Sequence, residues 1–162
     1  MILMLKGLPA SGKSTYAKEL VDKQHFARVN KDDLRAMINN GKWSDKNEKN
    51  IIKMRDMMIG RYTLSGVDVV VDDTNLDPKH EKQLRELAEK LNVAFCIKEF
   101  KTSIEECLRR DEKRENPVGK KVIWRMYNQY LNNPKKHFPQ GLNDGRKKAI
   151  IVDMRERLTK LI

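Results

Sequence analysis

The chain alternates between short apolar runs and longer stretches in which apolar residues recur at helical spacing. The short runs predict strands and lie at residues 2–5, 25–30, 67–71 and 93–100. The amphipathic stretches predict helices and begin near residues 13, 32, 51, 78, 103 and 120. Strands and helices that alternate in this way indicate an α/β domain with a parallel β-sheet flanked by helices on both faces.

Residues that begin or interrupt helices add detail to this prediction. Asp77-Pro78 supplies an N-cap followed by proline at the first helical position, and Ser103 with Glu106 forms a capping box. Residues 41–47 predict a polar break between two helices. The β-branched run at 67–71 has the composition of a central strand that is buried on both faces.

The connection between the first strand and the first helix carries the most specific motif. Its sequence, Gly7-Leu8-Pro9-Ala10-Ser11-Gly12-Lys13-Ser14-Thr15, contains G-x-x-x-x-G-K-[ST] in full. Backbone N–H groups of such a loop wrap a phosphate, and the positive end of the following helix dipole faces the same charge. Lys13 can reach the β- and γ-phosphates, and the Ser14 hydroxyl is placed to ligate Mg²⁺. We expect a nucleoside triphosphate site here; the alternative is a glycine-rich turn that binds no ligand.

A second polar segment, Asn30-Lys31-Asp32-Asp33-Leu34-Arg35, follows the second predicted strand. Ligands of parallel α/β sheets bind at the carboxyl ends of strands, so this segment should face the γ-phosphate. One carboxylate could accept a proton from an attacking hydroxyl, and a cation one helical turn away could hold an anionic acceptor. Asp32 could instead cap the second helix, or one carboxylate of the pair could cap while the other faces the substrate.

Two later segments are further candidates for the same site. Asp72-Asp73-Thr74-Asn75 ends an apolar strand and fits a Walker-B-like position, where Asp orients the waters of a metal or the substrate. Strands also end in Asp because of turn geometry alone. The charged run at 109–114 predicts a lid that closes over the triphosphate, although most such runs are solvated helix faces.

The composition excludes a membrane-spanning chain and leaves a cytoplasmic protein as the expectation. The 162 residues, 39% hydrophobic and 35% charged, suffice for one domain with a sizeable core. No run approaches the twenty or so apolar residues that a membrane span needs, and the N-terminus carries no secretion signal. We therefore expect the cytoplasm, or the cytoplasm of an infected host. Cys96 and Cys107 are predicted to be reduced core residues rather than a disulfide or a metal site.

The positive charge is concentrated in the last third of the chain. Of the net +11, residues 1–100 contribute 18 basic against 15 acidic side chains, and residues 101–162 contribute 16 against 8. This asymmetry suggests a polyanionic partner, most simply nucleic acid, or else a basic surface that binds nothing in particular. His25, His80 and His137 lack metal-ligand spacing, and Trp43 and Trp124 do not form a stacking ladder. Contacts to nucleic acid would therefore rest on phosphates.

Together, these segments resemble the polynucleotide 5′-kinase domain of phage and bacterial end-healing enzymes. The resemblance rests on G-L-P-A-S-G-K-S-T, N-K-D-D-L-R, V-D-D-T-N-L and the lid run L-R-R-D-E-K-R, which precedes W-R-M-Y. It covers residues 1–131. It implies a P-loop kinase fold with a helical lid, ATP or another nucleoside triphosphate as phosphate donor, Mg²⁺, and a nucleic-acid acceptor with a 5′-OH end.

The resemblance also implies roles for individual residues. Asp32 matches the general base that acts on the 5′-OH, and Arg35 matches an arginine that binds a phosphate of the acceptor strand. Lys31 stands where the family usually has Arg, which keeps the charge but loses the bidentate fork. Arg114 matches the lid arginine on the ATP phosphates, and Arg110 lies one helical turn earlier. Lys13, Asp32 and Arg114 are the expected catalytic residues.

The motif V-D-D-T-N-L adds to the acceptor side of the expected site. Asp73 matches a residue that helps to position the acceptor, and its neighbours Thr74 and Asn75 are expected to bind the acceptor with it.

Residues 132–162 depart from the phage relatives, in which a 3′-phosphatase domain follows the kinase. A predicted linker leads to a short strand at 149–152, which resembles the strand that opens such a domain. Asp153 stands at the nucleophile position, but Arg155 replaces the second Asp of D-x-D-G-T. We expect a degenerate or truncated start of a phosphatase domain, or a coincidental strand.

The predicted activity is transfer of the γ-phosphate of ATP to 5′-OH ends of DNA or RNA, in nucleic-acid end healing or repair. Two alternatives remain open from the sequence. One is a P-loop kinase whose acceptor is a small-molecule hydroxyl. The other is a nucleotide-gated nucleic-acid-binding module without phosphotransfer.

Overall fold

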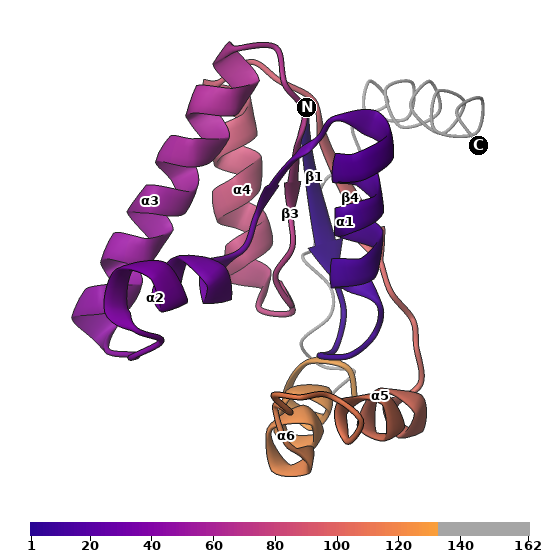
Figure 1. The fold of residues 1–162 in the computed structure, drawn as a ribbon. Coiled ribbons are helices and arrows are strands. Elements are labelled where there is room, and N and C mark those ends of the chain that lie inside the picture. The colour runs from indigo at the N-terminus through magenta and orange to yellow at the C-terminus, as the bar shows by residue number, and fades with distance from the viewer. Residues whose placement is uncertain (133–162) are drawn as a thin grey trace. The chain divides into compact units, whose positions relative to one another are not determined.

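Parallel strands and helices alternate along residues 1–132, the part of the chain that the computed structural model describes (Figure 1). The strands are β1 (Ile2–Lys6), β2 (Ala27–Val29), β3 (Val69–Val71) and β4 (Phe95–Glu99). The helices are α1 (Lys13–Gln24), α2 (Lys31–Asn39), α3 (Asp45–Leu64), α4 (Pro78–Lys90), α5 (Ile104–Asp111) and α6 (Lys120–Tyr130). The predicted α/β class is confirmed.

The strands form one parallel sheet in the order β2-β3-β1-β4. β1 lies between β3 and β4, so that Leu3 is opposite both Val70 and Cys96. The two inner strands are the most apolar because both of their faces are buried, and Val70 is 0% exposed. The loops that follow β1 and β3 therefore leave the sheet side by side.

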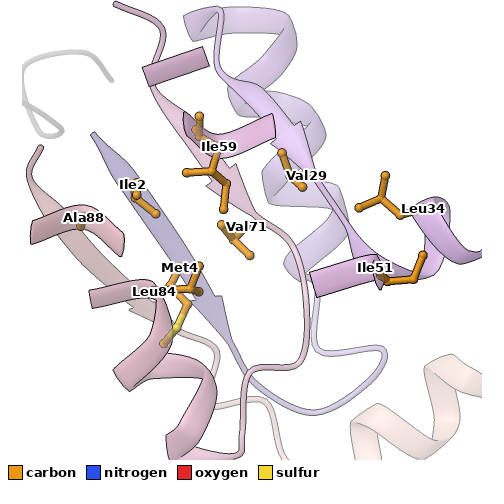
Figure 2. Packing of buried hydrophobic residues seen from close by; sticks show 10 residues of the cluster. Ile2, Met4, Val29, Leu34, Ile51, Ile59, Val71, Leu84 and Ala88 are labelled. Atoms are coloured by element: carbon orange, nitrogen blue, oxygen red, sulfur yellow. The ribbon is translucent and has the colours of Figure 1, made fainter. Parts of the chain in front are cut away.

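Helices cover both faces of the sheet, as predicted. Ile2 and Met4 of β1 point to the face that α3 and α4 cover, where they pack with Ile59 and Leu84 (Figure 2). Leu3 of β1, one position out of phase, belongs to the opposite core under α1. The sheet is thus a layer between two apolar cores.

A third core lies beyond the carboxyl ends of the strands. Ile104 and Cys107 of α5 and Ile123 of α6 pack around Leu8 of the loop after β1 and Leu76 of the loop after β3. Figure 1 shows α5 and α6 at the end of the sheet toward which the arrow of β1 points. This core holds the predicted lid helices over the strand ends.

Several element boundaries differ from those predicted. The strand predicted at 25–30 is shorter, because His25 closes α1 in a left-handed conformation (φ 57°) and Asn30 begins α2. α3 begins inside the predicted polar break, at Asp45, since the Ser44 side chain accepts a hydrogen bond from the Asn47 N–H. The predicted N-cap at Asp77 is confirmed.

The capping box at the start of α5 is only half formed. Ser103 Oγ accepts from the Glu106 N–H at 3.3 Å, but the Glu106 carboxylate pairs with Arg109 and Arg110 instead of returning to Ser103. Both cysteines are thiols, Cys96 in β4 and Cys107 buried in α5.

Apart from Asn132, the predicted linker and the strand at 149–152 lie outside the described residues. Along residues 1–132, none of the helices combines the length and the apolar composition that crossing a membrane requires.

Candidate active site

A cavity of about 1180 Å³ opens at the carboxyl ends of β1 and β3. The phosphate-loop motif and α1 contribute one wall: Pro9, Ala10, Gly12, Lys13, Ser14 and Thr15. The start of α2 and the loop after it contribute Asn30, Lys31, Asp32, Arg35, Gly41 and Trp43, and the loop after β3 contributes Asp72, Asp73 and Thr74. The lid side contributes Arg110, Arg114, Asn116, Pro117, Val118, Arg125 and Met126. Most of the residues predicted for the site meet in this one space.

The phosphate-loop motif is held tightly against the segment that follows β4. A Cβ added to Gly7 would lie 2.9 Å from Ser11 Oγ and 3.0 Å from the Phe100 backbone O. Thr102 Oγ1 donates to Ser11 O at 3.0 Å. Gly12 adopts φ 102°, a left-handed conformation that favours glycine, immediately before α1. These contacts fix the backbone of the loop on the side away from the cavity lining. The predicted nucleotide-binding residues that are not among the lining residues are Gly7, Leu8 and Ser11.

Replacing Gly7 with Ala is expected to lower the free energy of unfolding by about 1–3 kcal/mol, because the added methyl group overlaps the Phe100 backbone. Gly60→Ala is the matched control: it lies inside α3, its Cβ would meet only Leu91 Cδ2 at 3.8 Å, and Ala is the better helix former. Urea unfolding of both variants measures the difference. A Gly7→Ala variant as stable as the native chain would contradict this account of the loop.

Lys13 is buried at the start of α1, and its ammonium group is folded back onto the loop. Nζ lies 2.6 Å from Leu8 O, 3.1 Å from Gly7 O and 3.3 Å from Ser11 Oγ. Burial lowers the pKa of Lys13 from its ordinary 10.5 to about 8, against an opposing effect of Asp72. These contacts to carbonyl oxygens hold the Lys13 ammonium group at the cavity wall. A phosphate oxygen that enters the cavity could replace the carbonyl oxygens as its hydrogen-bond acceptor.

Ser14 faces Asp72, an aspartate with no role of its own in the predicted site. Ser14 Oγ donates to Asp72 Oδ1 at 3.2 Å, and Arg28 Nε donates to Asp72 Oδ2 at 2.7 Å. Asp72 is 1% exposed, and the negative charge of its buried carboxylate is balanced by the Arg28 guanidinium group. Asp72, directly after β3, is therefore the carboxylate of the predicted Walker-B-like segment that faces Ser14. Arg28 could not be found from local sequence, because it is brought to Asp72 by the pairing of β2 with β3.

Asp32 lies at the cavity and does not cap α2. The cap is Asn30, whose side-chain oxygen accepts from the Asp33 N–H at 2.9 Å, so the alternative in which Asp32 caps the helix is wrong. The Asp32 side chain is 84% exposed and pairs with Arg35 one turn along α2. Its carboxylate is accessible to a hydroxyl group in the cavity.

Arg35 is held by a glutamate from α3. Glu48 accepts from Arg35 Nε at 2.8 Å and from Arg35 Nη2 at 3.0 Å, and Lys31 Nζ lies 3.4 Å from the same carboxylate. The hydrogen bonds from Arg35 lower the pKa of Glu48 below its usual range. Glu48 therefore orients both cations of this wall. Glu48 is not predicted from the sequence, since no local spacing connects it to Arg35.

The residues after Asp72 divide between the cavity and the interior. Asp73 Oδ1 accepts from the Lys31 N–H at 2.9 Å, and burial raises the pKa of Asp73. Asp73 and Thr74 line the cavity. Asn75 is 0% exposed and donates to Leu5 O at 2.8 Å, so it ties the loop after β3 to β1 and is not part of the lining.

The lid side presents arginines from two segments. Arg110 pairs with Glu106 at 2.6 Å within α5, and Arg114 lies 3.6 Å from Asp111 just after it. Asp111 also accepts from the Val118 and Gly119 N–H groups, which fixes the turn between α5 and α6. Arg125 of α6, which is not among the predicted site residues, adds another cation to the lining.

Comparison with known proteins identifies relatives at both the sequence and the fold level. The chain is 30% identical, over 94% of its length and 24% of the relative, to a candidate bifunctional polynucleotide kinase/RNA ligase of Autographa californica nuclear polyhedrosis virus. It is 26% identical, over 98% of its length and 61% of the relative, to L-seryl-tRNA(Sec) kinase of Methanococcus maripaludis. The chain thus spans less than two thirds of either relative.

A solved structure gives the same indication. The fold superposes with a TM-score of 0.72 and 26% identity on a chain in the structure of the Pnkp1/Rnl/Hen1 RNA repair complex, covering 89% of this chain and 49% of that one. The resemblance to polynucleotide kinase domains that the motifs predict is confirmed by these similarities. Residues 2–131 match the AAA domain family, and the chain is a member of this family of P-loop proteins.

Proposed function

We propose that the chain is an ATP-dependent polynucleotide 5′-hydroxyl kinase that acts on DNA or RNA ends in end healing, with residues 1–131 as the kinase domain. The observation that carries the proposal is the shared cavity: it brings Lys13 of a phosphate loop together with Asp32 and Arg35. A loop that only binds nucleotide does not need a carboxylate and a paired arginine in the lining of the same cavity. The names of the viral relative and of the RNA repair complex support the same acceptor class.

The donor half of the proposed site consists of the phosphate loop, Lys13 and the lid arginines Arg110 and Arg114. Ser14 and Asp72 would hold Mg²⁺ between them, because a hydroxyl and a carboxylate oxygen 3.2 Å apart are the hard ligands this ion prefers. The ion would neutralise negative charge on the triphosphate. Lys13 and Arg114 would bind the oxygens of the γ-phosphate and stabilise their charge during transfer.

The acceptor half would supply the base and the clamp. Asp32 takes the proton of the 5′-OH as the acceptor oxygen bonds to the γ-phosphorus. The bond from that phosphorus to the β–γ bridging oxygen breaks, and ADP leaves. Arg35 would hold a phosphate of the acceptor strand and is oriented for this by Glu48. Asp73 fixes the start of α2, on which Asp32 stands, through the Lys31 N–H.

The affinity for ATP is expected to fall as the pH rises above about 8. Lys13 has a pKa of about 8 in the free protein, and bound phosphates favour its protonated form. Below that pH, Lys13 is protonated in both the free and the ATP-bound protein. Above it, binding of ATP must take up a proton, and the affinity falls by up to about tenfold per pH unit. Isothermal titration across the range checks this. Lys13→Met should show weak binding without the inflection, and a native profile that stays flat through pH 9 would contradict the assignment.

The function itself is tested by offering γ-labelled ATP with 5′-OH and 5′-phosphate oligonucleotides of DNA and RNA. We expect labelled product only from the 5′-OH ends. Binding or hydrolysis without a labelled product would instead indicate the nucleotide-gated module. If a small hydroxyl compound is labelled and oligonucleotides are not, the acceptor is a small molecule. Activity on long oligonucleotides should also decline steeply with added salt, because phosphate contacts release counterions.

A further inference from the structure

Trp43 is a large apolar side chain that the proposed transfer does not use. It is 66% exposed, whereas tryptophan is on average among the well-buried residues. It nevertheless belongs to the lining of the cavity, next to Gly41 and on the wall that carries Asp32 and Arg35. An exposed indole in the lining of a cavity is a surface on which a flat apolar group can bind.

The loop that carries Trp43 is fixed on both sides. The backbone N–H groups of Asn40 and Gly41 both donate to Arg35 O at the end of α2. On the other side Asn47 Nδ2 donates to Lys42 O at 3.4 Å, and Ser44 caps α3. The indole is therefore presented by an ordered backbone, so little conformational entropy is lost when a ligand contacts it.

The same hydrogen bonds tie Trp43 to the proposed acceptor clamp. The backbone oxygen of Arg35 accepts these bonds from the loop before Trp43, and its guanidinium group pairs with Glu48 and Asp32 at the cavity lining. Asp32 lies one helical turn before Arg35 and pairs with it. A carboxylate for a hydroxyl, a guanidinium for a phosphate and an aromatic face are thus all contributed to the cavity lining by residues 32–43.

We propose that Trp43 stacks on the 5′-terminal base of the acceptor strand. This inference rests on the proposed function and deepens it, because it specifies what is recognised beyond the hydroxyl and the phosphate. The Asp32 carboxylate, the Arg35 guanidinium and the Trp43 indole correspond to the hydroxyl, a phosphate and the base of a nucleotide end. Stacking on one indole accepts any base, since every base has a π-face, so this platform favours nucleic-acid ends over small hydroxyl compounds without selecting a sequence.

The test combines Trp43→Ala and Trp43→Phe with two acceptors, a 5′-OH oligonucleotide and the same oligonucleotide with an abasic 5′-terminal residue. Trp43→Ala should raise the KM for the normal acceptor by about 10- to 100-fold, and Trp43→Phe by much less. The abasic acceptor should have a high KM with the native chain that Trp43→Ala does not raise further. The KM for ATP should not change. Equal effects of Trp43→Ala on both acceptors would overturn the proposal.

A binding measurement keeps the inference separable from the kinase proposal. Trp124 on α6 is 38% exposed, contacts Tyr127 edge-on and is not among the lining residues, so it provides the matched control. In a Trp124→Phe variant Trp43 is the remaining tryptophan, and its fluorescence should be quenched by the normal oligonucleotide but not by the abasic one. This result would support stacking even if no oligonucleotide were phosphorylated. Absence of quenching by the normal oligonucleotide would overturn it.

Discussion

Replacing Asp32 with Asn is expected to reduce the rate of phosphate transfer by about 10²–10⁴-fold, while the affinity for ATP stays near that of the native chain. Asn cannot accept the proton of the 5′-OH, but it keeps the size of the side chain. The substitution should leave stability within about 0.5 kcal/mol, because the Asp32 side chain is 84% exposed. Single-turnover transfer of label to a 5′-OH oligonucleotide measures the chemical step, and titration with ATP measures the donor site.

The neighbouring carboxylate provides the control. Asp33 stands next to Asp32 on α2 but pairs with Arg28 and is not among the lining residues. Asp33→Asn should therefore retain transfer within a few-fold of the native rate. A native rate in Asp32→Asn, or an equal loss in both variants, would remove Asp32 from its proposed role.

Replacing Arg28 with Met is expected to lower the free energy of unfolding by about 3 kcal/mol. The Asp72 carboxylate is 1% exposed and would lose the guanidinium group that donates to its Oδ2 at 2.7 Å. A buried charge without its partner is strongly destabilising, although the 21% exposure of Arg28 lets some water reach the pair. Urea unfolding, followed by circular dichroism, gives the value directly.

A second substitution distinguishes loss of the ion pair from loss of packing. Arg28→Met/Asp72→Asn should be more stable than Arg28→Met alone, because no buried charge then remains. Lys82→Met removes an ion pair with Glu86 at 3.9 Å in which the lysine is 79% exposed, and it should change stability by less than about 0.5 kcal/mol. If adding Asp72→Asn to Arg28→Met does not restore stability, loss of the ion pair is not the cause of the destabilisation.

Much of this fold can be predicted because its signals are local. The buried run Val69–Val71 and the apolar β1 predict the central strands, and the fixed spacing of the phosphate loop predicts where a phosphate donor would bind. Boundaries are less predictable, since capping depends on atoms that a pattern does not reveal. Asn30, rather than Asp32, caps α2, and Ser44 starts α3 within a segment of polar composition.

The unpredicted part of the site depends on tertiary contacts. Glu48 reaches Arg35 because α3 packs on α2, and Arg28 reaches Asp72 because β2 pairs with β3. Asp72 and Asp73 are adjacent in sequence, yet one faces Ser14 and the other the Lys31 N–H. Asn75 shares the motif of its neighbours, but its left-handed backbone (φ 48°) and its bond to Leu5 O turn it inward. No spacing rule separates these orientations.

The packing of Leu8 has a consequence for exchanging parts between related proteins. This residue of the phosphate loop is 2% exposed and shares its core with Ile104, Cys107 and Ile123 of the lid helices. A hairpin of α5 and α6 grafted from another P-loop protein would bring different side chains against Leu8, which packs here with the residues of the native hairpin. Chimaeras that receive a foreign lid should therefore fold well only when residue 8 is exchanged together with it. The phosphate loop and the lid would then have to be replaced as one unit.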